Sequence, residues 1–138
     1  MKTSLQAVQK RIDQFLHHQR RELEKIDFVV GVSRGGLIPA TLIATAIDKP
    51  LLAVYIDRQD RVYIDRPEWI SGKRLLLVDD IVRTGSTLKK MLALLEQCKP
   101  TSILSFTLCC LKDASVRPTW TKMILKDRSM PWDHPRRS

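Results

Sequence analysis

The stretch LLLVDDIVRTGST, residues 75–87, decides the fold of this chain. Its first four residues are apolar, which is typical of a strand buried on both faces of a sheet. Two carboxylates, Asp79 and Asp80, follow where this strand would reach its C-terminal edge. A hydroxyl-rich loop comes next, and the apolar spacing of residues 88–96 then predicts an amphipathic helix.

This order of strand, acidic pair, loop and helix predicts a site for a sugar phosphate. The free N–H groups and the partial positive charge of a helix N-terminus attract a phosphate. Gly85 lets the backbone approach that phosphate closely, and the loop hydroxyls add hydrogen-bond donors. The Asp79 and Asp80 carboxylates can accept hydrogen bonds from vicinal sugar hydroxyls or hold a hydrated Mg²⁺. Alone, an Asp-Asp pair at a strand end would be an ordinary solvated edge.

Residues 75–87 resemble the motif that binds 5-phosphoribosyl 1-pyrophosphate (PRPP) in the type I phosphoribosyltransferases. That motif has four apolar residues, two acids, three variable positions and then Thr, Gly, Gly or Ser, and Ser or Thr, and this sequence meets every fixed position. The resemblance implies Mg²⁺ as a cofactor, with Asp79 and Asp80 at the metal. It assigns PRPP binding to Asp79, Asp80, Arg83, Thr84, Gly85, Ser86 and Thr87.

A second anion site is predicted within residues 28–47. The apolar run 28–32 predicts a strand, a loop with one arginine follows, and residues 37–47 predict a helix that tolerates Pro39 in its first turn. Beside the PRPP motif, this loop resembles the family's pyrophosphate loop. The segment VSRGGL matches the purine-salvage branch, in which the peptide bond before the arginine is commonly cis. The residues assigned to pyrophosphate are Ser33, Arg34, Gly35 and Gly36.

The polar segment DRQDRVYIDRP, residues 57–67, lies between the second and third predicted strands. The resemblance places here the family's flexible loop, a lid that excludes water from a cationic sugar intermediate. Arg58 and Arg61 are the candidates to reach the pyrophosphate when this loop closes. Residues 62–64 have an alternative interpretation, in which they pair as a small hairpin.

Alternating strands and helices predict an α/β fold with a parallel sheet and right-handed crossovers. A Rossmann-like sheet in the flavodoxin order 2-1-3-4-5, flanked by helices, would place loops 33–36 and 79–87 on opposite sides of one crevice. The five expected strands are residues 28–32, 51–56, 75–78, 103–111 and 123–125.

The chain of 138 residues is expected to form a single phosphoribosyltransferase domain. Its hydrophobic fraction of 43% and charged fraction of 28% are typical of a soluble globular protein. No apolar run approaches the roughly 20 residues that span a bilayer, and the N-terminus lacks the pattern of a signal peptide, so we expect a cytoplasmic protein with no membrane partner. Within the domain we expect an N-terminal helix at 3–24, a core at 28–125, and a small hood from the terminal segments that includes the tail 126–138.

The chain has three cysteines, Cys98, Cys109 and Cys110, which cannot all pair with one another. The vicinal pair lies in an apolar run, and no His or Cys stands at metal-ligand spacing from it. Buried free thiols in a reducing cytosol are therefore expected.

The net charge of +9 calls for anionic partners or a solvated basic surface. PRPP and pyrophosphate are anions and account for part of it. The remainder is open to two interpretations, a nucleic-acid face or a merely solvated surface. The predicted helix 3–24 carries much of the charge opposite its apolar stripe, at Lys10, Arg11, Arg20 and Arg21.

Two further matches to the xanthine-guanine branch predict the acceptor base. That branch has a lysine after its fourth strand that reaches the 6-oxo oxygen of the purine, and Lys112 matches it. It also has Pro-Trp-Asp in its hood, matched here by residues 131–133, where the Asp helps to read the purine's 2-position. The residues assigned to the base are Lys112, Trp132 and Asp133.

Two positions depart from the purine branch. Purine members carry an acid at the position of Arg83, close to N7 of the base, and arginine cannot take a proton there near neutral pH. The branch also stacks a Trp on the purine four residues before the hood Pro, where this chain has Asp127. Arg83 has three interpretations: loss of the proton acceptor, contact with an anion such as a carboxylated base or a nucleic-acid phosphate, or a side chain that points to solvent.

The resemblance implies an enzyme that transfers the 5-phosphoribosyl group from PRPP to a nitrogen of a base and releases pyrophosphate. The expected acceptor is an oxopurine, namely xanthine, guanine or hypoxanthine, and the product is its nucleotide. The alternative is a catalytically weak regulator that senses PRPP or nucleotide and binds nucleic acid through its basic surface. The resemblance also favours a homodimer or a higher homo-oligomer.

Overall fold

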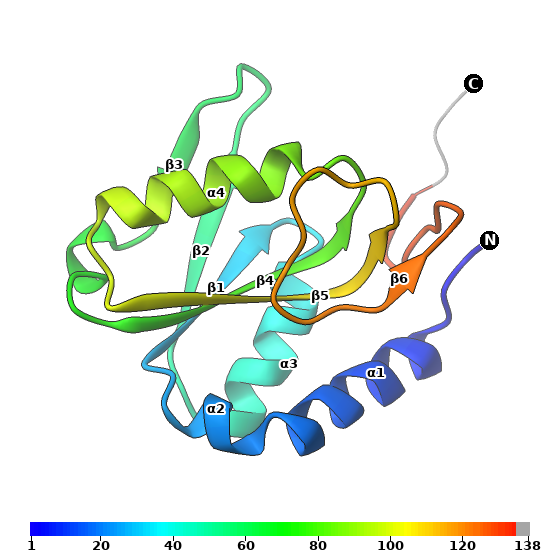
Figure 1. Cartoon of the computed structure of the whole chain (residues 1–138), viewed down its shortest axis with the longest axis horizontal. Helices are drawn as coiled ribbons and strands as arrows, with labels where there is room; N and C mark the ends of the chain where they lie inside the picture. The colour runs from blue at the N-terminus through cyan, green and yellow to red at the C-terminus, as the bar shows by residue number, and fades with distance from the viewer. Residues whose placement is uncertain (135–138) are drawn as a thin grey trace.

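The computed structural model describes residues 1–134, which form a six-stranded sheet flanked by helices (Figure 1). The strand order is β3-β2-β1-β4-β5-β6. The strands are β1 Phe28–Ser33, β2 Leu51–Ile56, β3 Val62–Ile64, β4 Arg74–Val82, β5 Ser102–Leu111 and β6 Met123–Ile124. The helices are α1 Leu5–His18, α2 Arg20–Glu24, α3 Leu37–Ile47 and α4 Ser86–Gln97, with a 3₁₀ turn at Pro67–Trp69.

The predicted strand order is confirmed, and the predicted number of strands is corrected. β2, β1, β4, β5 and β6 are parallel neighbours in that sequence, which is the expected flavodoxin order. Five strands is one too few, because β3 adds to the edge antiparallel to β2, with Tyr55 opposite Tyr63. Asp57 holds the intervening turn, since its carboxylate accepts hydrogen bonds from the backbone N–H groups of Gln59 and Arg61. The hairpin interpretation of residues 62–64 is therefore correct.

The predicted N-terminal helix is present but divides into α1 and α2. Ser4 caps α1, because its hydroxyl accepts a hydrogen bond from the N–H of Ala7 at 3.0 Å. The break falls at Gln19, whose N–H donates to the carbonyl of Phe15 while its backbone leaves the helical region. Both helices keep the expected apolar stripe toward the sheet, with Val8, Ile12 and Leu23 buried.

The apolar run before the acidic pair is buried on both faces, as its composition predicts. Leu76 and Val78 join the cluster beneath α1 and α3, while Leu75 and Leu77 join the cluster beneath α4. Figure 1 shows α1 and α3 on one face of the sheet and α4 on the other. Burial of a leucine side chain contributes about 1.5–3 kcal/mol, so this run fixes the position of the acidic pair firmly.

The two terminal segments lie side by side and form the predicted hood. The N–H of Thr3 donates to the carbonyl of Ser129 at 2.8 Å, and the N–H of Ser129 donates to the carbonyl of Met1 at 3.1 Å. Residues 135–138 of the predicted tail lie outside the described residues. Across residues 1–134, none of the helices combines the length and the apolar character that crossing a bilayer requires.

The three cysteines are free thiols. Cys109 and Cys110 are buried in β5, and Cys98 is partly exposed at the end of α4. Burial raises the pKa of Cys109 to about 11. That thiol therefore stays protonated near neutral pH, where a thiol is a poor nucleophile.

Candidate active site

The two predicted anion loops meet at one edge of the sheet. β1 and β4 are parallel neighbours, with Gly31 opposite Val78, so segments 33–36 and 79–87 lie side by side. The strand expected to end at residue 78 continues to Val82, because Asp79 and Val82 still pair with β5, so both acids lie within β4. The approach is close at Gly36, where a Cβ atom would lie 2.6 Å from the carbonyl oxygen of Val32 and 2.8 Å from that of Val78. Only glycine fits between these two strand ends. The two predicted anion loops are therefore neighbours, as the strand order implies.

The acidic pair lies in β4, beside loop 33–36. The Asp79 carboxylate accepts a hydrogen bond from the N–H of Asp80, and the Asp80 carboxylate accepts one from the N–H of Ile81, each at 2.8 Å. A Cβ on Gly35 would overlap the Asp80 carboxylate, so loop 33–36 and the acidic pair are closely packed. Burial raises the pKa of Asp79 well above its usual range, and the charge of Asp80 raises it further.

The acidic pair fits a magnesium ion that arrives with its substrate. Among residues 1–134, no group of three or more His, Cys, Asp or Glu side chains is placed to hold a metal ion. Mg²⁺ in phosphate-handling sites usually takes one or two carboxylates, with substrate oxygens and water as its other ligands. Asp79 and Asp80 provide that donor set at the crevice.

The loop before α4 turns sharply into the helix at the predicted phosphate site. Gly85 is the N-cap of α4 with φ +93°, a backbone conformation that other residues rarely adopt. The hydroxyl of Thr84 accepts a hydrogen bond from the N–H of Ser86 at 3.2 Å. A cavity of about 220 Å³ opens here against the first turn of α4, lined by Asp79, Ile81, Val82, Arg83, Thr84, Gly85, Thr87 and Leu88.

The segment after β5 supports this loop. The sequence analysis did not predict that contact. Both the N–H and the hydroxyl of Ser115 donate to the carbonyl of Thr84, at 2.8 and 2.9 Å. A Cβ on Gly85 would lie 2.6 Å from the backbone nitrogen of Val116, so the two segments are tightly packed. No pattern in the sequence marks Ser115, because its contact is made with a residue 31 positions away.

Arg34 stands exposed at the mouth of the crevice. The peptide bond between Ser33 and Arg34 is cis, as the resemblance to the purine-salvage branch implies. The next turn begins α3, where the N–H of Leu37 donates to the carbonyl of Arg34 at 3.1 Å. The arginine is therefore carried on a short loop directly beside the acidic pair.

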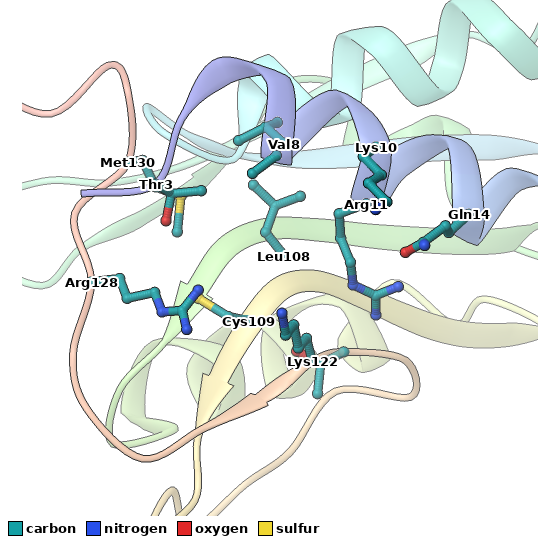
Figure 2. A pocket seen from close by; sticks show the side chains of 12 residues that line it. Thr3, Val8, Lys10, Arg11, Gln14, Leu108, Cys109, Lys122, Arg128 and Met130 are labelled. Atoms are coloured by element: carbon teal, nitrogen blue, oxygen red, sulfur yellow. The ribbon is translucent and has the colours of Figure 1, made fainter. Parts of the chain in front are cut away.

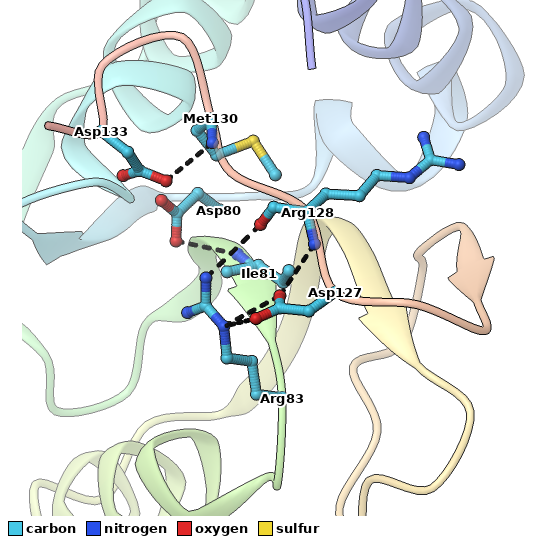
Figure 3. A network of polar contacts seen from close by, with 7 residues as sticks. All are labelled: Asp80, Ile81, Arg83, Asp127, Arg128, Met130 and Asp133. Carbon is cyan, nitrogen blue, oxygen red and sulfur yellow. Dashed lines mark hydrogen bonds and ion pairs between the residues drawn. The ribbon is translucent and has the colours of Figure 1, made fainter. Parts of the chain in front are cut away.

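Arg83 points into the hood, where it pairs with Asp127 (Figure 3). Its Nε donates to both carboxylate oxygens of Asp127 at 3.0 Å, and one terminal nitrogen lies 3.5 Å from the carbonyl oxygen of Arg128. The two positions that depart from the purine branch are thus partners of each other. They also line one cavity with Met1, Arg128, Ser129, Asp133 and His134.

The three residues predicted to bind the base have different surroundings. The indole Nε1 of Trp132 donates to the Asp80 carboxylate at 3.1 Å, so the hood closes directly onto the acidic pair. The Asp133 carboxylate accepts a hydrogen bond from the N–H of Met130 at 2.7 Å and closes the turn between them. Lys112 is exposed one residue past the end of β5. No hydrogen bond or ion pair within residues 1–134 joins its side chain to Arg83, Asp127 or Asp133.

The predicted flexible loop lies in the turn of the β2–β3 hairpin. Arg61 is held there, because its Nε donates to the Asp57 carboxylate at 2.7 Å. The neighbouring Asp60 forms an ion pair with Lys90 of α4 at 3.4 Å. Arg58 is exposed in the same turn, and neither arginine reaches the acidic pair in this arrangement.

Comparison with known proteins agrees with this geometry. Residues 3–134 match the model of the phosphoribosyl transferase domain family. The structure is similar to that of a purine phosphoribosyltransferase from Pyrococcus horikoshii, with a TM-score of 0.89 and 25% identity over 100% of this chain and 96% of that one.

Two curated proteins match a shorter part of the chain. An orotate phosphoribosyltransferase from Bartonella bacilliformis is 36% identical over 73 residues, which is 51% of this chain and 37% of that protein. The transcriptional regulator GfcR from Thermoplasma acidophilum is 29% identical over 77 residues, which is 51% of this chain and 39% of that protein. The match to the family model covers almost the whole length, so the chain belongs to the phosphoribosyl transferase domain family.

Proposed function

We propose that this protein transfers the 5-phosphoribosyl group of PRPP to a ring nitrogen of a nucleobase and releases pyrophosphate. The observation that carries this proposal is the direct contact between Gly35 of one anion loop and Asp80 of the other. PRPP has a phosphate at one end and a pyrophosphate at the other, and these loops offer one site for each. The acidic pair faces loop 33–36 and precedes loop 83–87, so the ribose would lie beside it.

Each part of the crevice has a task in this reaction. The first turn of α4 and the hydroxyls of loop 84–87 would hold the 5′-phosphate, which positions C1 of the ribose for attack. Asp79 and Asp80 would accept hydrogen bonds from the ribose hydroxyls and hold Mg²⁺. When bound, Mg²⁺ neutralises charge that develops on the departing pyrophosphate. Arg34 would stabilise the same leaving group from the other side of the crevice.

The hood would cover the acceptor base. The Trp132 indole already contacts Asp80, so a base bound beneath the hood would lie beside the ribose site. Lys112 and Asp133 remain the candidates to read the base edge. Arg58 and Arg61 would reach the pyrophosphate only if the β2–β3 turn moved toward the crevice, which requires Arg61 to leave Asp57. We also expect a homodimer or a higher homo-oligomer.

An oxopurine is the acceptor that these features favour. The Lys112 position and the 131–133 segment support it, as does the similarity to a purine phosphoribosyltransferase along the full chain. A carboxylated pyrimidine is the competing acceptor. It is favoured by Arg83, a cation at the base end of the crevice, and by the shorter match to orotate phosphoribosyltransferases.

Pyrophosphate release decides between these acceptors. The purified protein would be assayed with PRPP and Mg²⁺ against xanthine, guanine, hypoxanthine, adenine and orotate. We expect release with at least one oxopurine and none with orotate. Turnover of orotate alone would assign the carboxylated acceptor, and no release with any base would contradict the enzymatic function.

The second candidate is a regulator that binds nucleic acid. It is favoured by the exposed basic side chains of α1 and α2, namely Lys10, Arg20 and Arg21, and by the match to a transcriptional regulator. Binding of duplex DNA and RNA at rising salt concentration tests it, because phosphate contacts give a steep salt dependence. A regulator would bind in a PRPP-dependent manner. An enzyme with a solvated basic face would bind weakly and without regard to PRPP.

A further inference from the structure

A further cavity lies between α1, β5 and the C-terminal segment 128–130 (Figure 2). Its volume is about 550 Å³, which is within the usual range for small-molecule sites. Val8, Leu108 and Met130 give it a buried apolar floor. None of its lining residues belongs to the two anion loops or to the acidic pair.

The rim of this cavity is strongly basic. Four cationic side chains line it, from α1, from the segment before β6 and from the hood, while no Asp or Glu does. None of the four takes part in an ion pair within residues 1–134. Like charges that gather around a concave surface without counter-ions focus a positive potential and attract anions. These residues are Lys10, Arg11, Lys122 and Arg128.

Two polar atoms in the cavity wall are buried and have no hydrogen-bond partner in the described part of the chain. They are the hydroxyl oxygen of Thr3 and the Nε of Arg11. Buried polar groups are nearly always paired in folded proteins, because an unpaired one costs about 1–3 kcal/mol. Figure 2 shows the Arg11 and Arg128 side chains entering the cavity from α1 and from the C-terminal segment. An anion located between them would meet two guanidinium groups.

We infer that this cavity is a second ligand site, for a small phosphorylated molecule that carries an aromatic ring with polar edge atoms. The basic rim suits the phosphate, and the floor of Val8, Leu108 and Met130 suits the ring. Gln14 and Thr121 in the wall supply hydrogen-bonding groups for the edge of that ring. A nucleotide is the ligand class that combines these features.

The site stands beside the hood rather than inside the crevice. Arg128 joins the two, because its side chain lines the cavity while its carbonyl oxygen lies 3.5 Å from a terminal nitrogen of Arg83. Because the cavity shares no lining residue with the two anion loops, its test does not rest on the transferase function.

Calorimetric titration with AMP and with inorganic phosphate tests this site. The titrations use the Thr87→Glu background, because a carboxylate at the first turn of α4 repels phosphate from the crevice. We expect AMP to bind with a stoichiometry of about one, and more tightly than inorganic phosphate because the ring adds apolar contact. In this background, Lys10→Gln with Lys122→Gln should weaken AMP binding by about tenfold or more, since two charged donors are lost.

The matched control is Lys73→Gln with Lys99→Gln, which removes the same charge from exposed positions near the opposite end of β4. It should leave AMP binding unchanged. Ala7→Phe, at an exposed position of α1 that lines the cavity, should block binding while the melting temperature is retained. Equal weakening by both lysine pairs, no AMP binding in the Thr87→Glu background, or equal affinity for phosphate and AMP would overturn the inference.

Discussion

The Nε of Arg83 donates to both carboxylate oxygens of Asp127 at 3.0 Å, and this pair ties the PRPP loop to the hood. The side chains are about half exposed, so the pair contributes little to stability by itself. Its importance is its position, because it lies where the purine branch carries a proton acceptor and a stacking tryptophan. The two departures found in the sequence therefore form one ion pair, and we expect it to act on base recognition.

Replacing this ion pair by an acid should raise the rate with purines. We expect Arg83→Asp with Asp127→Asn to increase kcat for hypoxanthine by about 10²-fold, because a positioned general base contributes about 10²–10⁴. Asp127→Asn is included so that the new carboxylate does not face a like charge. Steady-state pyrophosphate release measures the effect.

The control for this change is Arg83→Asn with Asp127→Asn, which removes the same ion pair without adding a base. An equal increase in both variants would show that relief of the ion pair, and not proton transfer, sets the rate. Rapid purine turnover by the unaltered protein would contradict the argument from the missing proton acceptor.

Ser115 should affect PRPP affinity through its support of the Thr84 backbone rather than by contact with PRPP. Ser115→Ala removes the hydroxyl hydrogen bond to the Thr84 carbonyl and should lower the free energy of unfolding by about 1 kcal/mol. We expect PRPP affinity to fall by about three- to tenfold, because the phosphate loop loses one of its two supports. Calorimetry and thermal unfolding report the two effects. Exposed Ser71→Ala is the control, and an equal change in that variant would refute the supporting role.

Lys112 should contribute to binding of the acceptor base and not to binding of PRPP. Lys112→Ala should raise the KM for the base by about tenfold while PRPP affinity changes little, since one charge-assisted hydrogen bond to the base is lost. The comparison is with Lys73→Ala, an exposed lysine at the other end of the sheet. A parallel loss of PRPP affinity in Lys112→Ala would contradict this division of roles.

The raised pKa of Asp79 makes a prediction about stability and pH. Because the folded state holds this proton to higher pH than the unfolded state, ionisation of Asp79 opposes folding. The resulting loss of stability is absent below the unfolded pKa, near 4, and grows as pH rises toward the folded pKa. Asp79→Asn should therefore raise the melting temperature at pH 8 and change it little at pH 4. Exposed Asp113→Asn should show no such trend, and a destabilised Asp79→Asn at pH 8 would contradict the assigned cause.

The sequence was most informative where local pattern and packing agree. The four apolar residues before Asp79 identify a buried strand, and its order beside β1 follows from the alternation of strands and helices. Those two facts bring Gly35 to Asp80, which is the central contact of the site. The positive φ of Gly85 likewise follows from a loop that must turn sharply into α4.

Other contacts could not be predicted, because no periodicity encodes them. The Arg83–Asp127 pair joins polar surface residues 44 positions apart, and neither residue is marked by an apolar pattern. The β3 strand has only three residues, too few for alternation to distinguish it from a polar loop. The pairing of β3 depends on the turn that Asp57 closes. The Asp57 carboxylate also binds the side chain of Arg61, which the resemblance makes a candidate to reach the pyrophosphate.

Calorimetric titration of PRPP with Mg²⁺ into the Asp79→Asn/Asp80→Asn variant decides whether the acidic pair forms the substrate site. Circular dichroism should show an intact fold, because asparagine has nearly the same shape as aspartate and its amide oxygen can keep each hydrogen bond to the backbone. We expect PRPP affinity to fall by about a hundredfold or more, since charged hydrogen bonds to the ribose and the metal are lost together. Asp13→Asn with Asp48→Asn makes the same change in charge away from the crevice and should bind PRPP normally. A folded Asp79→Asn/Asp80→Asn variant with unchanged PRPP affinity would contradict the assignment of this site.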